Sequence, residues 1–283
     1  MVQKEKQKIV DLLQVYVNRK GSQNKAAASL KGVSTAVISH LINGNWEPYS
    51  NEMFRNIGNQ IGYNSHSWQF VETTNAKFLL TTLEKVKQQQ SVVSIIANAG
   101  SGKTEVSKKY ASENSDVIRV ECASYWDEKH FLQQILMEMG IRNPHNRIPQ
   151  MMEEIIKGLK NYDTPPELIV DEVDKLRDCM LYFLITFYNE LKWKCSIVLQ
   201  STYYFKKRLE DGVRNRRKGY EELLSRFGTF IELEQTSAAD VALLAAAQGI
   251  TDRVVISTIQ KKCNGDLRIA AELIRIYKLE NGI

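Results

Sequence analysis

The stretch SIIANAGSGKT, residues 94–104, decides the fold. It begins within a compact apolar run, residues 92–97, whose β-branched side chains are typical of a buried strand. Its last three residues match the end of the phosphate-loop pattern G-x-x-x-x-G-K-[ST]. Ala97 takes the place of the first glycine, which is tolerable where strand becomes loop if its φ stays negative. The stretch therefore predicts a nucleotide site at the end of a strand.

The loop supplies the groups that such a site needs. Backbone N–H groups of the loop and of the next helix point at phosphate oxygens. Lys103 would neutralise the β and γ oxygens, and the Thr104 hydroxyl would coordinate Mg²⁺. A Gly/Ser turn followed by a chance Lys-Thr is the alternative, and the helical pattern over residues 105–112 weighs against it. The residues predicted to contact the nucleotide here are Asn98, Ala99, Gly100, Ser101, Gly102, Lys103 and Thr104.

A second apolar run, ELIVDE at residues 167–172, ends in two carboxylates. Asp171 would hold the water shell of Mg²⁺, and Glu172 would polarise the attacking water. Adjacent acids also occur on ordinary exposed loops, but the phosphate loop upstream favours a catalytic pair. We therefore expect an ATPase that uses ATP and Mg²⁺, with Thr104 and Asp171 at the metal.

The rest of the chain predicts an α/β core between two helical parts. Helical stretches separate the strand-like runs, which indicates a parallel sheet covered on both faces. The further strand-like runs are residues 117–120, 168–170, 196–199 and 229–233, and the helical stretches are 128–139, 150–160 and 180–192. The expected divisions are a helical head at 1–65, a helical linker at 66–90, the core at 91–235 and a helical lid at 236–283.

Composition narrows the class of protein without naming a partner. The chain has 283 residues and a net charge of +5, which permits a polyanion partner but does not require one. Its four cysteines have no short spacing, so a zinc site or a disulfide framework is not expected. No secretory signal or membrane span is apparent. We expect a cytoplasmic protein of a bacterial or phage-infected cell that does not act at a membrane.

The head contains a segment, residues 24–44, that resembles a helix-turn-helix of the phage-repressor type. Small Ala28 would let two helices cross, Gly32 would permit the turn, and Ser34 would cap the second helix. The expected shared core is Val33, Ile38 and Leu41. The expected DNA contacts are Lys25, Lys31, Thr35, Ser39, His40 and Asn43. A three-helix bundle without a DNA role is the alternative, and few base-reading side chains favour weak or nonspecific duplex binding.

Three further motifs resemble those of AAA+ ATPases. DEVDKL, residues 171–176, is similar to the DEAxxL segment of initiator and transposition ATPases. The resemblance implies that Thr202, or else Ser201, contacts the attacking water. It also implies that Arg226, in the sequence LLSRF, reaches the nucleotide of an adjacent subunit and that Arg268, in GDLR, reads the γ-phosphate in cis.

Two segments of the core are candidates for contact with DNA. Lys206, Lys207, Arg214, Arg216 and Arg217 belong to the densest positive charge in the chain. They indicate a loop against DNA or a neighbouring subunit, or else a solvated helix face. Tyr125 and Lys129 follow the second strand, a region that can line the central channel of ring or spiral ATPases, although aromatic residues there can equally be core.

The order of these motifs resembles AAA+ target-selection ATPases of the phage Mu B type along essentially the whole chain. Departures are Ala97 and a rather short C-terminal tail. The resemblance implies ATP-dependent filaments on duplex DNA with little sequence preference, delivery of that DNA to a DDE transposase, and activation of strand transfer. Two alternatives stay open: a replication initiator or helicase loader, and a nucleotide-switched transcription regulator.

Overall fold

The computed structural model describes residues 3–63, 68–141 and 145–281. The chain divides into two compact units, Met1–Gln69 and Phe70–Ile283, which are described separately. Within the described ranges, no helix combines the length and the apolar character that crossing a bilayer requires.

The first unit is a bundle of four helices: α1 (Gln3–Lys20), α2 (Gln23–Ser29), α3 (Thr35–Ile42) and α4 (Asn51–Gln60). Val33, Ile38 and Leu41 are buried in its core, as the sequence predicts. Ser34 Oγ accepts a hydrogen bond from the N–H of Val37, which confirms the predicted cap. The expectation for Ala28 is wrong: Ala28 is exposed, and Ala26 fills the buried position between the helices.

The second unit is built on a parallel five-stranded sheet with the order β2-β3-β4-β1-β5, and the predicted α/β class is confirmed. Every pair of neighbouring strands is parallel. The central strands are buried along their whole length because helices cover both faces. The strands are β1 (Val92–Ile96), β2 (Val117–Glu121), β3 (Glu167–Asp171), β4 (Ser196–Ser201) and β5 (Phe230–Glu232).

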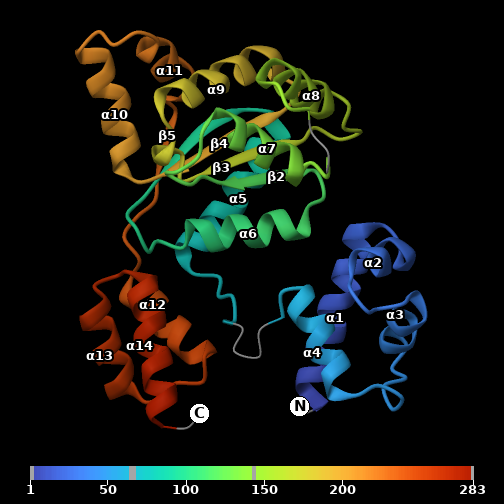
Figure 1. Ribbon diagram of the computed structural model, residues 1–283. Helices are drawn as coiled ribbons and strands as arrows, with labels where there is room; N and C mark the ends of the chain where they lie inside the picture. The colour runs from blue at the N-terminus through green and yellow to red at the C-terminus, as the bar shows by residue number, and fades with distance from the viewer. Residues whose placement is uncertain (1–2, 64–67, 142–144, 282–283) are drawn as a thin grey trace. The chain divides into compact units, whose positions relative to one another are not determined.

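Two layers of helices enclose this sheet (Figure 1). One layer consists of α5 (Thr74–Gln89) and α6 (Lys103–Glu113). The other contains α7 (Glu128–Glu138), α8 (Ile148–Lys160) and α9 (Asp178–Leu191). A 3₁₀ turn, η1 (Val173–Lys175), follows β3, and the pair α10 (Tyr203–Arg214) and α11 (Tyr220–Phe227) connects β4 to β5.

The sequence assigns residues 66–90 to a linker, and the structure corrects this for α5. Ala76, Leu79, Leu83 and Val86 of α5 pack in one hydrophobic cluster with residues of β1, β3 and β4. Burying this apolar stripe makes α5 part of the core. The apolar positions recur at helical spacing in the sequence, but only the sheet shows what they pack against.

The C-terminal part of the second unit is a bundle of three helices, α12 (Ala238–Ala247), α13 (Arg253–Cys263) and α14 (Leu267–Glu280). It is joined to the start of α5 by polar contacts. Asp240 Oδ1 accepts hydrogen bonds from the N–H and the hydroxyl of Thr74, at 2.8 and 3.1 Å. The Asn75 amide donates to the carbonyl of Glu234 at 2.8 Å.

Candidate nucleotide site

The phosphate loop runs from the carboxyl end of β1 to the first turn of α6. Gly100 and Gly102 have φ of +74° and +89°, a region that favours glycine. Gly102 caps α6 without a side-chain hydrogen bond, so N–H groups of the first turn point out of the helix end. Ala97 is buried and keeps a negative φ, as its substitution for glycine requires. The loop thus has the geometry of an anion site.

Lys103 lies against this loop. Its ammonium donates to the carbonyls of Ala97 and Asn98 at 3.0 and 3.1 Å and to Ser101 Oγ at 3.1 Å. Burial lowers the pKa of Lys103, and the carboxylates of Asp171 and Asp174 oppose that shift. The lysine is therefore a buried cation that the loop itself solvates.

Thr104 and Asp171 lie together, as the sequence requires of a metal pair. The Thr104 hydroxyl donates to Asp171 Oδ2 at 2.9 Å, and Asp171 Oδ1 accepts the N–H of Glu172, also at 2.9 Å. A hydroxyl and a carboxylate are hard oxygen donors, and Mg²⁺ is commonly bound by few protein oxygens together with phosphate and water. The donor set therefore fits that cation.

Arg119 is a site residue that the sequence analysis missed. It projects from β2, and its Nη2 donates to Asp171 Oδ2 at 2.7 Å. Burial raises the pKa of Asp171, and the Arg119 guanidinium opposes this shift. The available signal was a single charged residue within the apolar run from Val117 to Val120.

Glu172 follows directly, in the left-handed region at φ +54°. Its carboxylate forms an ion pair with Lys175 of η1. This turn separates its side chain from that of Asp171, which faces Thr104. A nucleotide would meet the two acids in different environments, one buried and one partly exposed.

The end of β4 carries the predicted sensor residues. The Thr202 hydroxyl donates to Asp174 Oδ2 at 3.4 Å and does not cap α10. Ser201 Oγ and both amide atoms of Gln200 are buried and lack a hydrogen-bond partner in the described part of the chain. Gln200 was missed by the sequence analysis, although it follows the apolar run that ends at Leu199.

The start of α14 meets the phosphate loop. The N–H of Leu267 donates to the carbonyl of Gly100 at 2.9 Å. A Cβ built on Gly100 would lie 1.9 Å from Asp266 Oδ1, so only glycine fits here. Arg268 is exposed, and its charge contributes to the lowered pKa of Lys103. The helix that carries the predicted arginine of the lid therefore begins against the loop that carries the lysine.

Arg226 lies elsewhere, on α11. It forms an ion pair with Glu222 at 2.8 Å, donates from Nε to Asn189 at 3.1 Å, and its guanidinium lies 5.5 Å from the centre of the Tyr188 ring. These partners belong to α9 and α11. Its recorded contacts include none with the phosphate loop within the described residues.

The head presents the predicted DNA-contact residues on several elements. Lys25, Lys31, His40 and Asn43 are exposed, and Thr35 and Ser39 are half-buried. His40 Nδ1 is 2.8 Å from the Tyr49 hydroxyl, and the Asn43 amide donates to Ser39 Oγ at 3.4 Å. The segment from α2 to the end of α3 therefore has an exposed polar surface that includes few positive charges.

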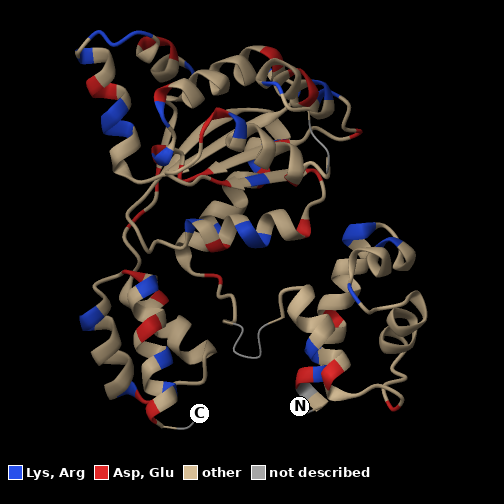
Figure 2. Cartoon of the chain, in the orientation of Figure 1, with Lys and Arg blue, Asp and Glu red and all other residues tan. Residues whose placement is uncertain are grey.

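The basic segment of the core, defined as Lys206–Lys218, runs through α10 and the loop to α11. Figure 2 shows its positive charge along α10 and this loop. Lys206, Arg214 and Arg217 form ion pairs with Glu232, Asp211 and Asp178, respectively. Lys207 and Arg216 are exposed and form no side-chain ion pair or hydrogen bond among the described residues.

The second core candidate combines one exposed and one buried aromatic residue. Tyr125 is 82% exposed, whereas its neighbour Trp126 is buried in the core cluster. Lys129 is half-buried on α7. Tyr125 and Lys129 thus remain accessible to a partner, and Trp126 does not.

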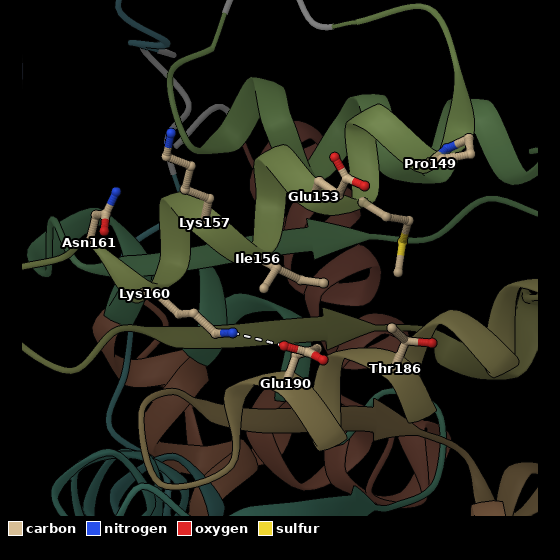
Figure 3. Close-up of a pocket in the computed structure, with 9 residues that line it drawn as sticks. Pro149, Glu153, Ile156, Lys157, Lys160, Asn161, Thr186 and Glu190 are labelled. Carbon is tan, nitrogen blue, oxygen red and sulfur yellow. Dashed lines mark hydrogen bonds and ion pairs between the residues drawn. The ribbon is translucent and has the colours of Figure 1, made fainter.

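A separate surface groove of about 550 Å³ lies between α8 and α9. Figure 3 shows Ile156 on its floor and the Lys160–Glu190 ion pair, 2.8 Å long, at one end. The residues that line it, from Pro149 to Glu190, do not include the phosphate loop or the acidic pair. This groove is therefore distinct from the nucleotide site.

Comparisons with known proteins cover the part of the chain that contains the phosphate loop and the acidic strand. A family model described as an AAA domain matches residues 86–209. The ATP-dependent target DNA activators B of Escherichia phages Mu and D108 are each 25% identical over 276 residues, which cover 93% of this chain and 86% of the relative.

Solved structures share the fold. The Aeropyrum pernix Orc1 protein, solved in complex with DNA, has a TM-score of 0.58 at 18% identity, covering 75% of this chain and 61% of that one. Cdc6p from Pyrobaculum aerophilum has a TM-score of 0.57 at 13% identity, covering 77% and 65%. The chain thus spans less than two thirds of either structure. Residues 86–209, which contain the phosphate loop and the acidic strand, thus match an AAA domain, and the chain is similar along most of its length to the target DNA activators B of phages Mu and D108.

Proposed function

We propose that this ATPase binds duplex DNA in an ATP-dependent way with little sequence preference, assembles on it into a helical filament, and presents it to a DDE transposase whose strand transfer it activates. Support comes from relatives named as ATP-dependent target DNA activators, whose alignment spans 93% of the chain. The observation within the structure that carries the proposal is a polar connection between the nucleotide site and the basic segment.

That connection is centred on Asp178, at the first turn of α9. Asp178 accepts hydrogen bonds from Arg208 at 2.6 Å, Arg217 at 2.7 Å and the Tyr220 hydroxyl at 2.7 Å. Arg208 also donates to the carbonyls of Asp174 and Leu176, which follow the acidic strand. A change at η1 on hydrolysis would therefore be felt by the basic segment.

The phosphate loop would bind the nucleotide in this scheme. N–H groups of the loop and of α6 would hold the phosphates, and Lys103 would exchange its loop oxygens for phosphate oxygens. Thr104 and Asp171 would hold Mg²⁺, which would supply positive charge beside the phosphates. The loop residues Asn98 to Gly102 would enclose the phosphates through their backbone.

Glu172 would act as the base that orients and polarises the attacking water. Its ion pair with Lys175 would have to open, and the distorted backbone at Glu172 makes it a separate group from Asp171. Thr202, with Ser201 second, would contact the same water from β4. Arg268 would read the γ-phosphate in cis, and Arg226 would reach the nucleotide of a neighbouring subunit once its contacts with Glu222 and Asn189 release.

Two surfaces would contact DNA. In the core, Lys207 and Arg216 offer positive charge that no carboxylate of the described residues pairs, whereas Lys206, Arg214 and Arg217 would first have to leave carboxylate partners. Tyr125 and Lys129 would add a second contact. In the head, the face formed by residues 25–43 would bind duplex weakly, because it carries few cations.

Assembly on random-sequence duplex DNA tests the proposal. The full chain would be mixed with DNA and ATP, ADP or a slowly hydrolysed ATP analogue, and sedimentation and electron microscopy would report assembly. We expect filaments with the triphosphates only, and loss of filaments with Lys103→Ala and Arg226→Ala. Arg275→Ala is the matched control, since this exposed lid arginine forms its ion pair within its own helix, with Glu272.

The other functions predict different products. Closed hexamers without DNA would replace the proposal with a helicase loader or initiator. Discrete dimers on one preferred sequence would replace it with a nucleotide-switched transcription regulator. Addition of a candidate transposase to the filaments, with strand transfer as readout, then tests the partner.

A further inference from the structure

Arg119 of β2 is a nearly buried arginine with three side-chain partners, and the proposed ATPase mechanism gives it no role. Its side chain is 10% exposed, and that of Asp171 is 1% exposed. Nε donates to Ser107 Oγ at 2.9 Å, and Nη2 donates to Asp171 Oδ2 at 2.7 Å and to Glu121 Oε2 at 3.0 Å. One guanidinium therefore joins β2, β3 and α6.

These contacts fix the carboxylate that faces Thr104. Asp171 Oδ2 accepts from Arg119 and from Thr104, and Oδ1 accepts from the N–H of Glu172. Three donors from three different elements leave the carboxylate one orientation. Ser107, the second acceptor of Arg119, also donates to the carbonyl of Thr104 at 3.1 Å, so the arginine is anchored on the same turn of α6.

Lys103 makes this restraint important. Its ammonium donates to the loop carbonyls of Ala97 and Asn98, and the next residue along the chain, Thr104, contacts Asp171. A carboxylate without another cationic partner would be drawn into an ion pair with that ammonium. Such a pair would remove the lysine from the phosphates and the carboxylate from the cation.

We propose that Arg119 is a positioning residue for the divalent cation of the nucleotide: it holds the Asp171 carboxylate beside Thr104 and away from Lys103. This inference rests on the proposed Mg²⁺ site. Groups that orient a metal-site carboxylate affect metal affinity by about 10–100-fold when removed. The planar guanidinium is suited to this role because it donates in fixed directions to Ser107 and Asp171 at once.

The test separates binding of the nucleotide from binding of its cation. Thermal unfolding of the full chain with saturating ADP would be followed in EDTA and then across a Mg²⁺ titration. We expect Arg119→Met to keep the stabilisation by ADP in EDTA and to raise the Mg²⁺ concentration for half-maximal further stabilisation by about 10–100-fold. Arg119→Lys should restore the wild-type Mg²⁺ midpoint only in part, because an ammonium keeps the charge but lacks the planar pair of donors of the guanidinium.

Two further variants make the result specific. Ser107→Ala removes the anchor of Arg119 and should shift the Mg²⁺ midpoint in the same direction by less. Lys108→Met removes a neighbouring cation that pairs with Glu105 and Glu121 at 3.5 and 3.3 Å, and it should leave the midpoint unchanged.

Each outcome has one meaning. A wild-type chain that ADP stabilises equally with and without Mg²⁺ would overturn the proposed metal site itself. If the wild-type chain responds to Mg²⁺ and Arg119→Met has the same midpoint, the role of Arg119 alone is overturned. The same conclusion follows if Arg119→Met loses as much stabilisation by ADP in EDTA as it loses with Mg²⁺. If Arg119→Met does not fold, an unchanged midpoint in Ser107→Ala overturns the inference.

Discussion

The nucleotide site and the basic segment differ in whether their charged side chains are buried and have partners within the chain. Asp171 and Lys103 are buried, and neighbouring donors or acceptors within the chain satisfy both. Lys207 and Arg216 are exposed, and no side-chain partner satisfies either of them among the described residues. Internal partners preorganise a site for a small, charged ligand, whereas unpaired surface cations are free for a large polyanion. The comparison predicts where substitutions act on chemistry and where they act on association.

The largest effect is expected at the acidic pair. Glu172→Gln should lower kcat for ATP hydrolysis by about 10²–10⁴-fold while nucleotide binding persists, because the amide cannot accept the proton of the attacking water. Steady-state hydrolysis and nucleotide binding measured on one preparation check this. Glu138→Gln, at an exposed end of α7, is the control. Near-normal turnover in Glu172→Gln would assign the base to another carboxylate, with Asp174 the next candidate.

Gly100 tests whether the lid belongs to the nucleotide site. An alanine there has the wrong φ and a Cβ 1.9 Å from Asp266 Oδ1, so the Asp266 side chain that caps α14 must shift. We expect nucleotide affinity to fall on the order of 10–100-fold, since small displacements of positioned groups are costly. Gly140→Ala is the matched control: its φ is +83°, and among the described residues no atom beyond its chain neighbours lies within 4 Å of the new Cβ.

Both glycine variants should lose about 1–2 kcal/mol of stability from the backbone alone. Only Gly100→Ala should weaken nucleotide binding, measured by titration calorimetry. Equal affinities for the two variants would show that contact between α14 and the loop is not needed for binding.

The basic segment should respond to salt rather than to nucleotide. Lys207→Ala/Arg216→Ala should reduce the slope of log K against log salt for duplex DNA by about 2, if each side chain contacts one phosphate. ATP turnover without DNA should be unchanged. Lys261→Ala/Lys262→Ala removes the same charge from the exposed surface of α13 and should leave the slope unchanged. A slope that changes equally in both pairs would point to net charge rather than to a defined surface.

Glu167 extends the comparison of buried and exposed charges. It is a buried carboxylate at the start of β3, and it lacks the donors that hold Asp171 at the end of the same strand. Burial raises the pKa of Glu167 from 4.5 to about 8, and the Lys87 ammonium opposes the shift only in part. The folded chain then keeps a proton that the unfolded chain has released above pH 4.5. Stability from this group is therefore lost as pH rises towards 8.

The expected loss between pH 6 and pH 7 is about 1 kcal/mol, or roughly 2–4 °C in Tm. Glu167→Gln should remove this slope, and thermal unfolding across that pH range measures it. A wild-type Tm that is level from pH 6 to pH 7 would contradict a protonated Glu167.

Features that depend on residues close in the sequence could be predicted from it, and features that depend on distant residues could not. The alternation of strands and helices, the phosphate loop and the serine cap of α3 depend on neighbouring residues, and the sequence predicts them. The assignment of α5 to a linker was wrong because its apolar stripe packs against β1, β3 and β4, which lie far from it or beyond it in the sequence. Ala26 and Ala28 are equally small, and only the packing of the head distinguishes them.

The sequence by itself determined which groups an ATPase site would use: a lysine and a threonine after one buried strand and two carboxylates at the end of another, because the carboxyl ends of parallel strands share one edge of a sheet. The tertiary structure decided which partners these groups have. It brought Arg119 to Asp171, although 52 residues separate them in the chain. It also placed Asp266 against Gly100 and paired Arg217 with Asp178, whereas no described carboxylate pairs with Arg216. Such contacts depend on which strands and helices become neighbours, and no local pattern of residues encodes that.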